Sequence, residues 1–403
     1  MTISQSTPLR LLVIGVSWPP ETFLNRLFKR IATRGIHVTL VTSDKPRQNT
    51  DLAPNVDIWY LPGWDHKPVQ RPVRLGRRLV GGTLRSMVDT RHFFSAARSA
   101  GAGVESLAQL YCWLPFAGRH WDVCYIPWNS TAIDYLPLID LWPSVISCRG
   151  SQINIAPLNP LRTSLREGLS ISFDKASAVH CVSEAIRDEA MRYGLDKAKS
   201  AVIHPAVDPD MFRPLPVGSR PDEDILRVIS TGSVNWRKGY GYALSAIRRL
   251  VDRGVPVQYD LIGDGPEQQR LLYTIQDLEL GDHVVRHGKL PPDKVLARLQ
   301  EADVFLLSSL SEGISNAVLE GMACGLPVVT TDVGGMSEAV TDGVEGFLTP
   351  PLDSVSLADA LEELWRAPEL RQRMGAAGRA RVLRDFSLDD QADAFVELFR
   401  SVA

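Results

Sequence analysis

The chain has little of several features that each indicate a particular class of protein. Its five cysteines among 403 residues are scattered and show no Cys-x-x-Cys spacing, which indicates reduced thiols in a cytosolic protein. The net charge is only −3, so nucleic acid is not expected as a partner. No uncharged apolar stretch reaches the roughly 18 residues that a membrane span needs, and no basic segment precedes the first apolar run as in a signal peptide. We therefore expect a cytoplasmic protein.

A dinucleotide-binding pattern is also missing after the first apolar run. That place holds Gly15-Val-Ser-Trp-Pro19 instead of Gly-x-Gly-x-x-Gly, which counts against a dinucleotide-dependent oxidoreductase or a sugar-nucleotide epimerase. The Asp-x-Asp sequence Asp208-Pro-Asp210 stands in a proline-rich stretch and is interpreted as a turn.

Short apolar runs alternate with helical patterns in both halves of the chain. Residues 10–17, 21–33 and 38–42 predict a strand, a helix and a strand, which is a β-α-β opening. Residues 204–224 carry five prolines and several acids, and the alternation restarts at residues 226–230. Composition is that of an ordinary globular protein, with 44% hydrophobic and 23% charged residues.

These patterns predict an α/β protein with two doubly wound, Rossmann-like domains facing a central cleft. A chain of this length has room for two cores. The expected division is a first domain over 1–205, a linker over 206–224, a second domain over 225–385 and a last helix over 386–403.

The most informative segment holds two carboxylates in a strand, loop, helix, strand order. An apolar run at residues 304–307 ends in small polar residues and Glu312, and a helix-like stretch with Glu320 follows. Glu312 should lie at the carboxyl edge of a parallel sheet, where such sheets bind ligands. Ser315 or Asn316 can cap the helix, whose first N–H groups then face the same edge. This arrangement suits a phosphorylated polyol such as a sugar nucleotide.

A second segment, Ser230 to Gly239, combines a glycine with two cations at the start of a helix. Gly232 allows close approach of the backbone to a ligand, and Arg237 and Lys238 place positive charge beside it. Such a turn can hold a diphosphate. The alternative is a solvated basic turn before a helix.

At these two segments the chain resembles the retaining GT-B glycosyltransferases of family 4. The spacing of Glu312 and Glu320 is similar to the Glu-x7-Glu signature of that family, and residues 321–329 and 334–343 continue the pattern. Ile262-Gly-Asp-Gly-Pro266 and Val182-Ser-Glu-Ala185 resemble two further family elements. The loop from Trp18 to Phe23 is similar to that of exopolysaccharide- and colanic-acid-type members.

The resemblance implies transfer of a sugar from a nucleotide-diphosphate donor, of UDP or GDP type, to an acceptor hydroxyl with retention of configuration. The acceptor would be a glycan, a lipid-linked or a small molecule held by the first domain, and neither a metal nor another cofactor is expected. The last helix would return to the first domain. The implied donor-binding positions are Gly232, Ser233, Arg237, Lys238, Gly313, Ile314, Ser315, Asn316 and Glu320.

The resemblance also implies individual roles. Glu312 and Lys238 would be the catalytic residues: Glu312 would hold donor-sugar hydroxyls and shape charge near the anomeric carbon, and Lys238 would bind the diphosphate. Glu320 would accept hydrogen bonds from the ribose diol. The base would lie near residues 287–290, with His287, Lys289 and Leu290 as its expected contacts.

Several positions depart from the family pattern. Ser233 stands where an arginine is usual, and Arg237 is the expected replacement; Ile314 and Ser315 stand where Phe-Gly is common. Arg149 occupies the place of a histidine near the acceptor, and a permanently charged guanidinium cannot act as a base. It is expected to bind a phosphate or carboxylate of the acceptor, or the donor diphosphate, with a surface ion pair as the alternative.

The loop after the first strand carries two more candidates. Glu21 and Thr22 are expected to contact a donor phosphate or an acceptor hydroxyl, with an ordinary helix cap as the alternative. A non-catalytic sugar-nucleotide-binding protein stays open as the rival function, because of Ser233 and Arg149.

Residues 67–99 predict a basic amphipathic segment that contacts anionic membrane, at the inner face. Apolar residues alternate with cations in this segment. The alternative to membrane contact is a solvated helical face that packs on its own domain. The segment contains one acid, Asp89, and eight cations, which are Lys67, Arg71, Arg74, Arg77, Arg78, Arg85, Arg91 and Arg98.

Overall fold

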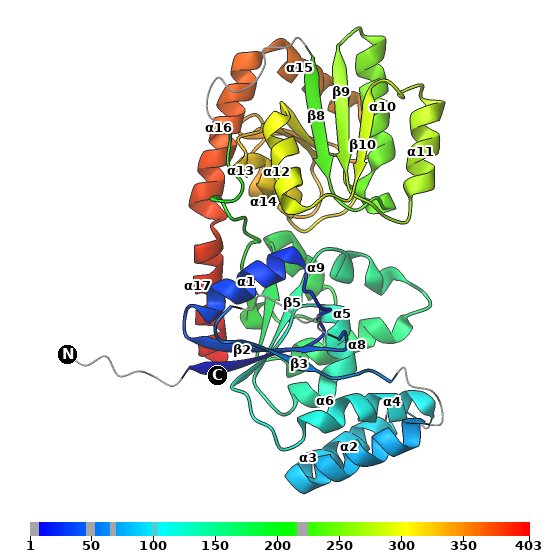
Figure 1. Cartoon of the computed structure of the whole chain (residues 1–403), viewed down its shortest axis with the longest axis vertical. Helices are drawn as coiled ribbons and strands as arrows, with labels where there is room; N and C mark the ends of the chain where they lie inside the picture. The colour runs from blue at the N-terminus through cyan, green and yellow to red at the C-terminus, as the bar shows by residue number, and fades with distance from the viewer. Residues whose placement is uncertain (1–7, 46–52, 65–69, 100, 102, 216–224) are drawn as a thin grey trace, which may run out of the picture. The chain divides into compact units, whose positions relative to one another are not determined.

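The computed structural model describes residues 8–45, 53–64, 70–99, 101, 103–215 and 225–403 (Figure 1). The chain divides into two compact units. Within the described residues, the first unit takes in the chain up to Val182, Arg187–Ile203 and Ala392–Ala403. The second holds Ser183–Ile186 and His204–Gln391.

The first unit contains a seven-stranded sheet in the order β3-β2-β1-β4-β5-β6-β7, in which every described pairing is parallel. The order reverses between β1 and β4, which is the kind of point where doubly wound sheets bind ligands. The strands are β1 (Leu9–Val13), β2 (Ile36–Thr42), β3 (Val56–Tyr60), β4 (Val123–Ile126), β5 (Ser144–Cys148), β6 (Ala178–Cys181) and β7 (Ser200–Val202).

Helices cover this sheet, and their apolar spacing explains how they pack. In α1 (Thr22–Ala32), Leu24, Leu27, Phe28 and Ile31 recur at helical intervals and are all buried. Helix α17 (Leu388–Val402) adds its later residues to the same core. Helix α9 (Glu184–Met191) starts in residues of the second unit. The remaining α-helices of the first unit are α2 (Arg71–Arg85), α3 (Met87–Ser99), α4 (Val104–Trp113), α5 (Asn129–Ala132), α6 (Leu136–Ile139), α7 (Ser151–Asn154) and α8 (Thr163–Lys175).

The second unit contains a six-stranded sheet in the order β10-β9-β8-β11-β12-β13, again with parallel pairing throughout the described strands. The strands are β8 (Leu226–Thr231), β9 (Val257–Ile262), β10 (Val284–Gly288), β11 (Val304–Leu307), β12 (Val328–Thr331) and β13 (Gly346–Thr349). The helices are α10 (Tyr240–Asp252), α11 (Gln268–Asp277), α12 (Pro292–Glu301), α13 (Asn316–Ala323), α14 (Met336–Ala339), α15 (Ser354–Arg366) and α16 (Pro368–Asp385).

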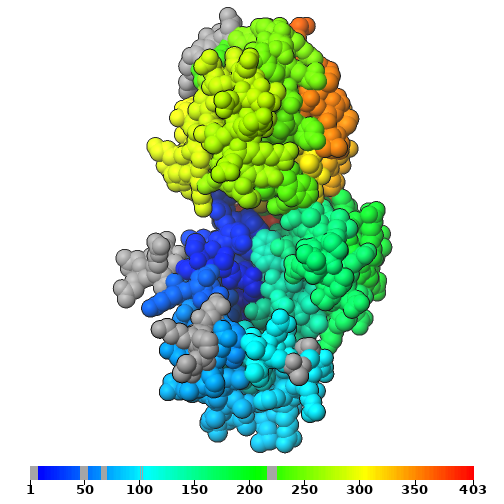
Figure 2. Space-filling model, turned by 90° about the vertical axis from the view of Figure 1, so that its right-hand side faces the viewer, coloured from blue at the N-terminus to red at the C-terminus, as the bar shows by residue number. Residues whose placement is uncertain are grey.

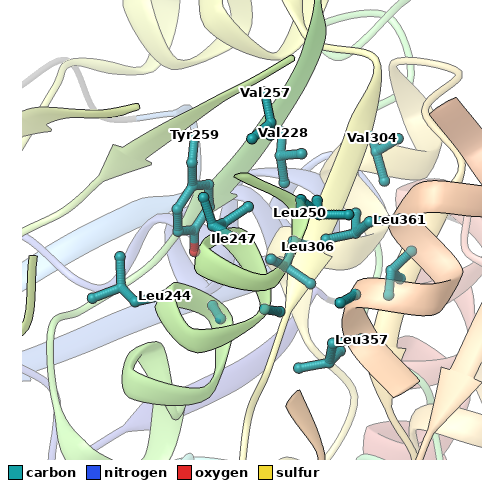
Figure 3. Close-up of a cluster of buried hydrophobic side chains, with 14 of the residues drawn as sticks. Val228, Leu244, Ile247, Leu250, Val257, Tyr259, Val304, Leu306, Leu357 and Leu361 are labelled. Carbon is teal, nitrogen blue, oxygen red and sulfur yellow. The ribbon is translucent and has the colours of Figure 1, made fainter. Parts of the chain in front are cut away.

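Neighbouring strand residues in the second unit belong to cores on opposite faces of the sheet. Figure 3 shows one of these cores, where side chains of β8, β9 and β11 meet those of α10 and α15. Val228 belongs to this core, whereas Ile229 belongs to the one that contains α13. Where both faces are buried, as at β11, the strand is a continuous apolar run, and such runs could be predicted from the sequence. The predicted fold class, two doubly wound Rossmann-like domains, is confirmed.

Residues 206–215, which the sequence predicts as part of a linker, pack within the second unit. Val207 and Phe212 are buried in its core. Arg379 of α16 donates hydrogen bonds to the carbonyl groups of Phe212 and Pro209, at 2.7 and 3.0 Å. The rest of the predicted linker, 216–224, lies outside the described residues.

Candidate functional site

A cavity of about 660 Å³ opens in the second unit at the carboxyl ends of four neighbouring strands. Residues 231–233 line it after β8, residues 263–264 after β9, residues 289–290 after β10, and residues 312–320 in part after β11. The full lining is Thr231, Gly232, Ser233, Lys238, Ile262, Gly263, Asp264, Lys289, Leu290, Val295, Glu312, Ile314, Ser315, Asn316, Ala317 and Glu320. Most of the predicted donor-binding residues are therefore brought together in one cavity.

The two residues predicted to be catalytic form an ion pair in this cavity. Lys238 Nζ lies 2.6 Å from Glu312 Oε1, and both side chains are largely buried. The hydroxyl of Ser309 donates to the same carboxylate oxygen at 2.8 Å. A cation and a carboxylate are thus held together beyond the carboxyl ends of two adjacent strands, although they are 74 residues apart in the sequence.

The loop after β8 is held by backbone contacts that leave its glycine close to the cavity. The N–H of Gly232 donates to the Ile262 carbonyl at 2.9 Å, and the Tyr240 hydroxyl donates to the Gly232 carbonyl at 3.2 Å. Burial, and to a lesser extent the charge of Glu312, raises the pKa of Tyr240. The hydroxyl therefore keeps its proton at neutral pH and continues to hold this carbonyl. Sequence reasoning missed Tyr240.

The start of α13 faces the cavity without a side-chain cap. Ser315 occupies the N-cap position, but it makes no side-chain capping bond, and neither does Asn316, whose buried Oδ1 has no partner among the described residues. The expected cap is therefore absent. The first N–H groups of α13 are left with their partial positive charge beside Glu312, which is the arrangement that attracts an anion.

Two predicted donor-binding residues and one predicted base contact lie outside the cavity lining. Arg237 and Gly313 contribute backbone contacts instead: the Arg237 carbonyl accepts from Leu310 N–H at 2.6 Å, and the Gly313 carbonyl accepts from Gly335 N–H at 2.7 Å. Nε2 of His287 lies 2.5 Å from Oδ1 of Asp260, within hydrogen-bonding distance. Whether Arg237 supplies the charge missing at Ser233 stays a prediction, and only Lys289 and Leu290 represent the predicted base contacts in the lining.

Some lining residues were not predicted. Asp264 and Gly263 belong to the Ile262-Gly-Asp-Gly-Pro266 turn. The resemblance of this turn to a family element could have identified both residues as part of the site. Val295 and Ala317 are apolar and carried no signal.

The segment around Glu338 holds another part of the second unit in place. The Glu338 carboxylate accepts from the N–H groups of Glu184 and Ala185, at 2.9 and 3.0 Å, and contacts His204 Nε2 at 3.1 Å. Burial would raise the pKa of Glu338, but these hydrogen bonds outweigh it and lower the pKa. This contact joins two of the segments by which the chain resembles family 4.

In the first unit, the structure brings Arg149 next to the segment that contains Glu21 and Thr22. Arg149 follows β5, and its guanidinium carbon lies 5.1 Å from the ring centroid of Phe23, in the first turn of α1. A surface ion pair, the alternative for Arg149, is wrong: the residue is 9% exposed, and no carboxylate in the described part of the chain pairs with it. Glu21 precedes α1 but makes no side-chain cap, so that alternative also fails for Glu21.

Two further properties concern metal ions and membranes. Among the described residues, no group of three or more His, Cys, Asp or Glu side chains is placed to hold a metal ion. Likewise, none of the helices in the described ranges combines the length and the apolar character needed to cross a membrane.

Two family models match the chain. The one described as "Glycosyl transferases group 1" matches residues 215–381, and the one described as "Glycosyltransferase Family 4" matches residues 136–211. Together they cover more than half of the chain.

Curated and solved relatives agree with these models. The chain is 36% identical over 186 residues to the putative colanic acid biosynthesis glycosyltransferase WcaL of Escherichia coli K12, so the match covers 45% of each chain and less than half the length of this relative. Sucrose-phosphate synthase from Thermosynechococcus elongatus has a TM-score of 0.76 at 18% identity, over 98% of either chain. Anabaena HepE in complex with UDP has a TM-score of 0.71 at 16% identity, over 98% of this chain and 100% of that one.

At such identities the solved structures show the fold alone, and that fold is GT-B. The family models and the sequence match to WcaL identify the family within that fold. The chain therefore belongs to the GT-B glycosyltransferases of family 4.

Proposed function

We propose that the chain is a retaining glycosyltransferase that moves a sugar from a nucleotide-diphosphate donor to an acceptor hydroxyl without a metal ion. The observation that carries this proposal is the single cavity in which Lys238, Glu312 and the uncapped start of α13 meet. Breaking the bond to the anomeric carbon leaves negative charge on the diphosphate, and positive groups already in place stabilise that charge. Lys238 and the N–H groups of α13 supply them.

The other lining residues take complementary roles in this proposal. Glu320 accepts hydrogen bonds from the ribose diol, and Lys289 and Leu290 contact the base. Glu312 holds hydroxyl groups of the donor sugar and stabilises the positive charge that develops near the anomeric carbon. The acceptor hydroxyl attacks on the face that the diphosphate leaves, and a leaving phosphate oxygen takes its proton. No side chain then has to act as a strong base.

The donor is proposed to be of UDP or GDP type, and the acceptor a carbohydrate, lipid-linked or small molecule bound by the first unit. HepE was solved with UDP, and WcaL is named for colanic acid biosynthesis, which supports a nucleotide sugar and a polysaccharide product. The rival proposal is a binding protein without turnover, and the exposed Ser233 at the usual place of an arginine favours it.

A thermal-shift panel of nucleoside diphosphates tests the donor site. One base should raise the melting temperature, because a ligand at 100 times its Kd stabilises the folded state by about 2.7 kcal/mol. A Lys238→Met variant should lose most of the shift. The absence of any shift across the panel would contradict the proposed function, and a shift without hydrolysis or transfer of the matching nucleotide sugar would favour the rival.

We further propose that the α2–α3 surface rests on anionic membrane at the inner face of a cytoplasmic membrane. These helices lie together with α4 at one end of the first unit, in blue to cyan in Figure 2. Leu84 and Val88 are 83% and 77% exposed on either side of the break at Ser86. Other exposed residues of the two helices include Val73, Arg77, Val80, Met87, Arg91, Phe94 and Arg98.

Two cations of this segment, Arg78 and the exposed Arg85, also donate hydrogen bonds to their own domain. Arg78 donates to the Tyr111 carbonyl at 2.6 Å and stacks on its ring, and Arg85 donates to the Ala117 carbonyl at 2.9 Å. The acid Asp89 accepts from the Gly118 N–H at 2.7 Å. These contacts agree in part with the alternative of a helical pair packed on its own domain. Lys67 lies outside the described residues.

Flotation with vesicles that contain phosphatidylserine tests this surface. The wild type should float with the vesicles at low salt, and a Leu84→Glu/Val88→Glu variant should lose at least tenfold in binding, because two apolar contacts are replaced by charges that anionic lipid repels. Leu383→Glu, at an exposed leucine of α16, is the matched control. If the wild type stays at the bottom of the gradient at low salt, the membrane proposal is wrong.

A further inference from the structure

Arg149 is a buried cation that has no counterion among the residues that the structure describes. Only 9% of the residue is exposed, and its Nε is buried with no hydrogen-bonding partner. Its Nη2 donates to the Tyr125 hydroxyl at 3.1 Å. Within the described ranges, no carboxylate comes within ion-pair distance of it, Glu21 included. Burying a charge in this way is unfavourable unless some anion joins it.

A chain of hydrogen bonds fixes how Arg149 is held. The Tyr125 hydroxyl lies 2.8 Å from Ser147 Oγ, which lies 2.7 Å from His180 Nδ1, and His180 Nε2 lies 2.8 Å from the Ile203 carbonyl. The carbonyl can only accept and the guanidinium can only donate. Arg149 therefore donates at one end of the chain, and Nε2 of His180 donates to the Ile203 carbonyl at the other.

This chain contains no carboxylate, so it orients Arg149 without neutralising the charge of the guanidinium. Both ring nitrogens of His180 are engaged within the chain. Phe395 of α17, whose ring centroid is 4.7 Å from that of His180, helps keep water away.

The start of α1 adds a second positive feature at the same place. The Arg149 guanidinium lies over the ring of Phe23, the second residue of this 11-residue helix. The first turn of α1 contains no acid, and the N-cap residue Glu21 provides no side-chain hydrogen bond. The partial positive charge of the helix start is therefore left beside a buried guanidinium.

We propose that Arg149 and the start of α1 form a binding site for an oxyanion, a phosphate or a carboxylate, in the first unit. The guanidinium offers two parallel N–H donors to such a group, and the helix start offers backbone N–H donors. That the anion belongs to a substrate rests on the proposed function. It is then an anionic group of the acceptor or the diphosphate of the donor.

Inorganic phosphate, at constant ionic strength kept with KCl, is the ligand for the first experiment. Phosphate at tens of millimolar should raise the melting temperature of the wild type by about 2 °C. An Arg149→Met variant should lose this shift and should melt no lower than the wild type, because an apolar side chain of similar length replaces an uncompensated charge. Arg192→Met, at an exposed arginine of the same unit, should keep the shift.

Arg149→Lys is the second variant, in case the methionine protein does not fold. It keeps the charge but lacks the paired donors, so its phosphate shift should fall by at least half. No phosphate shift in the wild type, or an equal shift in Arg149→Met or Arg149→Lys, overturns the proposal. So does an Arg149→Met protein that melts several degrees lower while its phosphate shift is unchanged, because the arginine would then be structural.

Two further arms identify the source of the anion. The phosphate shift is measured again in Lys238→Met, where the cavity of the second unit has lost its cation, and in wild type saturated with the best nucleoside diphosphate. A phosphate shift that adds to the nucleotide shift supports an acceptor anion, and one that the nucleotide abolishes supports the donor diphosphate. A shift that depends on Lys238 and not on Arg149 overturns the site. Failure of the proposed function would appear separately, as a lack of any nucleotide shift.

Discussion

A Glu312→Gln variant should lose turnover by about two to three orders of magnitude and yet bind a nucleoside diphosphate at least as tightly as the wild type. The two effects have opposite signs because Glu312 has two partners. In the structure its carboxylate is paired with Lys238 Nζ at 2.6 Å. During the proposed reaction it stabilises the sugar as positive charge develops on the anomeric carbon.

The amide of glutamine keeps the shape of the side chain and removes its charge. Lys238 then has no competing carboxylate and is free to pair with the diphosphate, so affinity for the nucleotide should stay equal or rise several-fold. The transition state loses its nearest anion, and stabilisation of this kind is worth roughly 3 to 4 kcal/mol in enzyme sites. Titration calorimetry with the nucleoside diphosphate and a nucleotide-sugar hydrolysis or transfer assay measure the two quantities.

Glu301→Gln is the matched control, since Glu301 pairs with Arg298 on the exposed surface of the same unit. It should change neither quantity, because exposed pairs contribute little. Unchanged turnover in Glu312→Gln would remove Glu312 from the proposed chemistry. Weaker nucleotide binding would instead indicate that Glu312 positions Lys238 for the diphosphate.

The cavity could be predicted from sequence because of a simple property of parallel sheets. Glu312, Lys238 and Gly232 each follow a buried apolar run, and the ends of such runs meet at one edge. Spacing along the chain was then enough to place the residues together. Glu320, two turns into α13, follows from the same helix.

Side-chain partners from distant segments could not be predicted in this way. His287 pairs with Asp260, which lies on the neighbouring strand and not near it in the sequence. Ser315 stands at the position of a cap and does not form one. The buried state of Arg149 depends on Tyr125 and Phe23, which reach it from two other elements. Each of these outcomes is decided by tertiary contacts, which local patterns do not contain.

The proline-rich stretch before β8 shows the same limit. Its composition is typical of a linker, but Phe212 within it is apolar and is buried beside α13 and α16. One buried aromatic side chain and the hydrogen bonds of Arg379 outweigh the preference of the surrounding prolines for an exposed chain.

A Gly334→Ala variant should be destabilised more strongly than a Gly343→Ala variant, although both glycines have a left-handed backbone. Their φ angles are +58° and +77°. Alanine in this conformation costs about 1 to 2 kcal/mol at either position. A Cβ at Gly343 would meet nothing within 4 Å, whereas a Cβ at Gly334 would lie 2.0 Å from the carbonyl oxygen of Glu312.

That carbonyl belongs to the loop that carries the proposed catalytic carboxylate, so relief of the clash has to move the loop. Gly335 ties the loop from the other side, since its N–H donates to the Gly313 carbonyl at 2.7 Å. We expect Gly334→Ala to lower the free energy of unfolding by about 3 kcal/mol or more, and nucleoside-diphosphate affinity at least tenfold. Gly343→Ala should keep wild-type affinity.

Urea denaturation and calorimetry on the two variants give both numbers. Equal losses of stability with equal nucleotide affinities would mean that the backbone strain alone matters and that Gly334 does not support the loop. A loss of affinity confined to Gly334→Ala would link the Gly334-Gly335 pair to the position of Glu312. The small residues after β12 would then be required because the Glu312 loop packs directly against their backbone, with no room for a side chain.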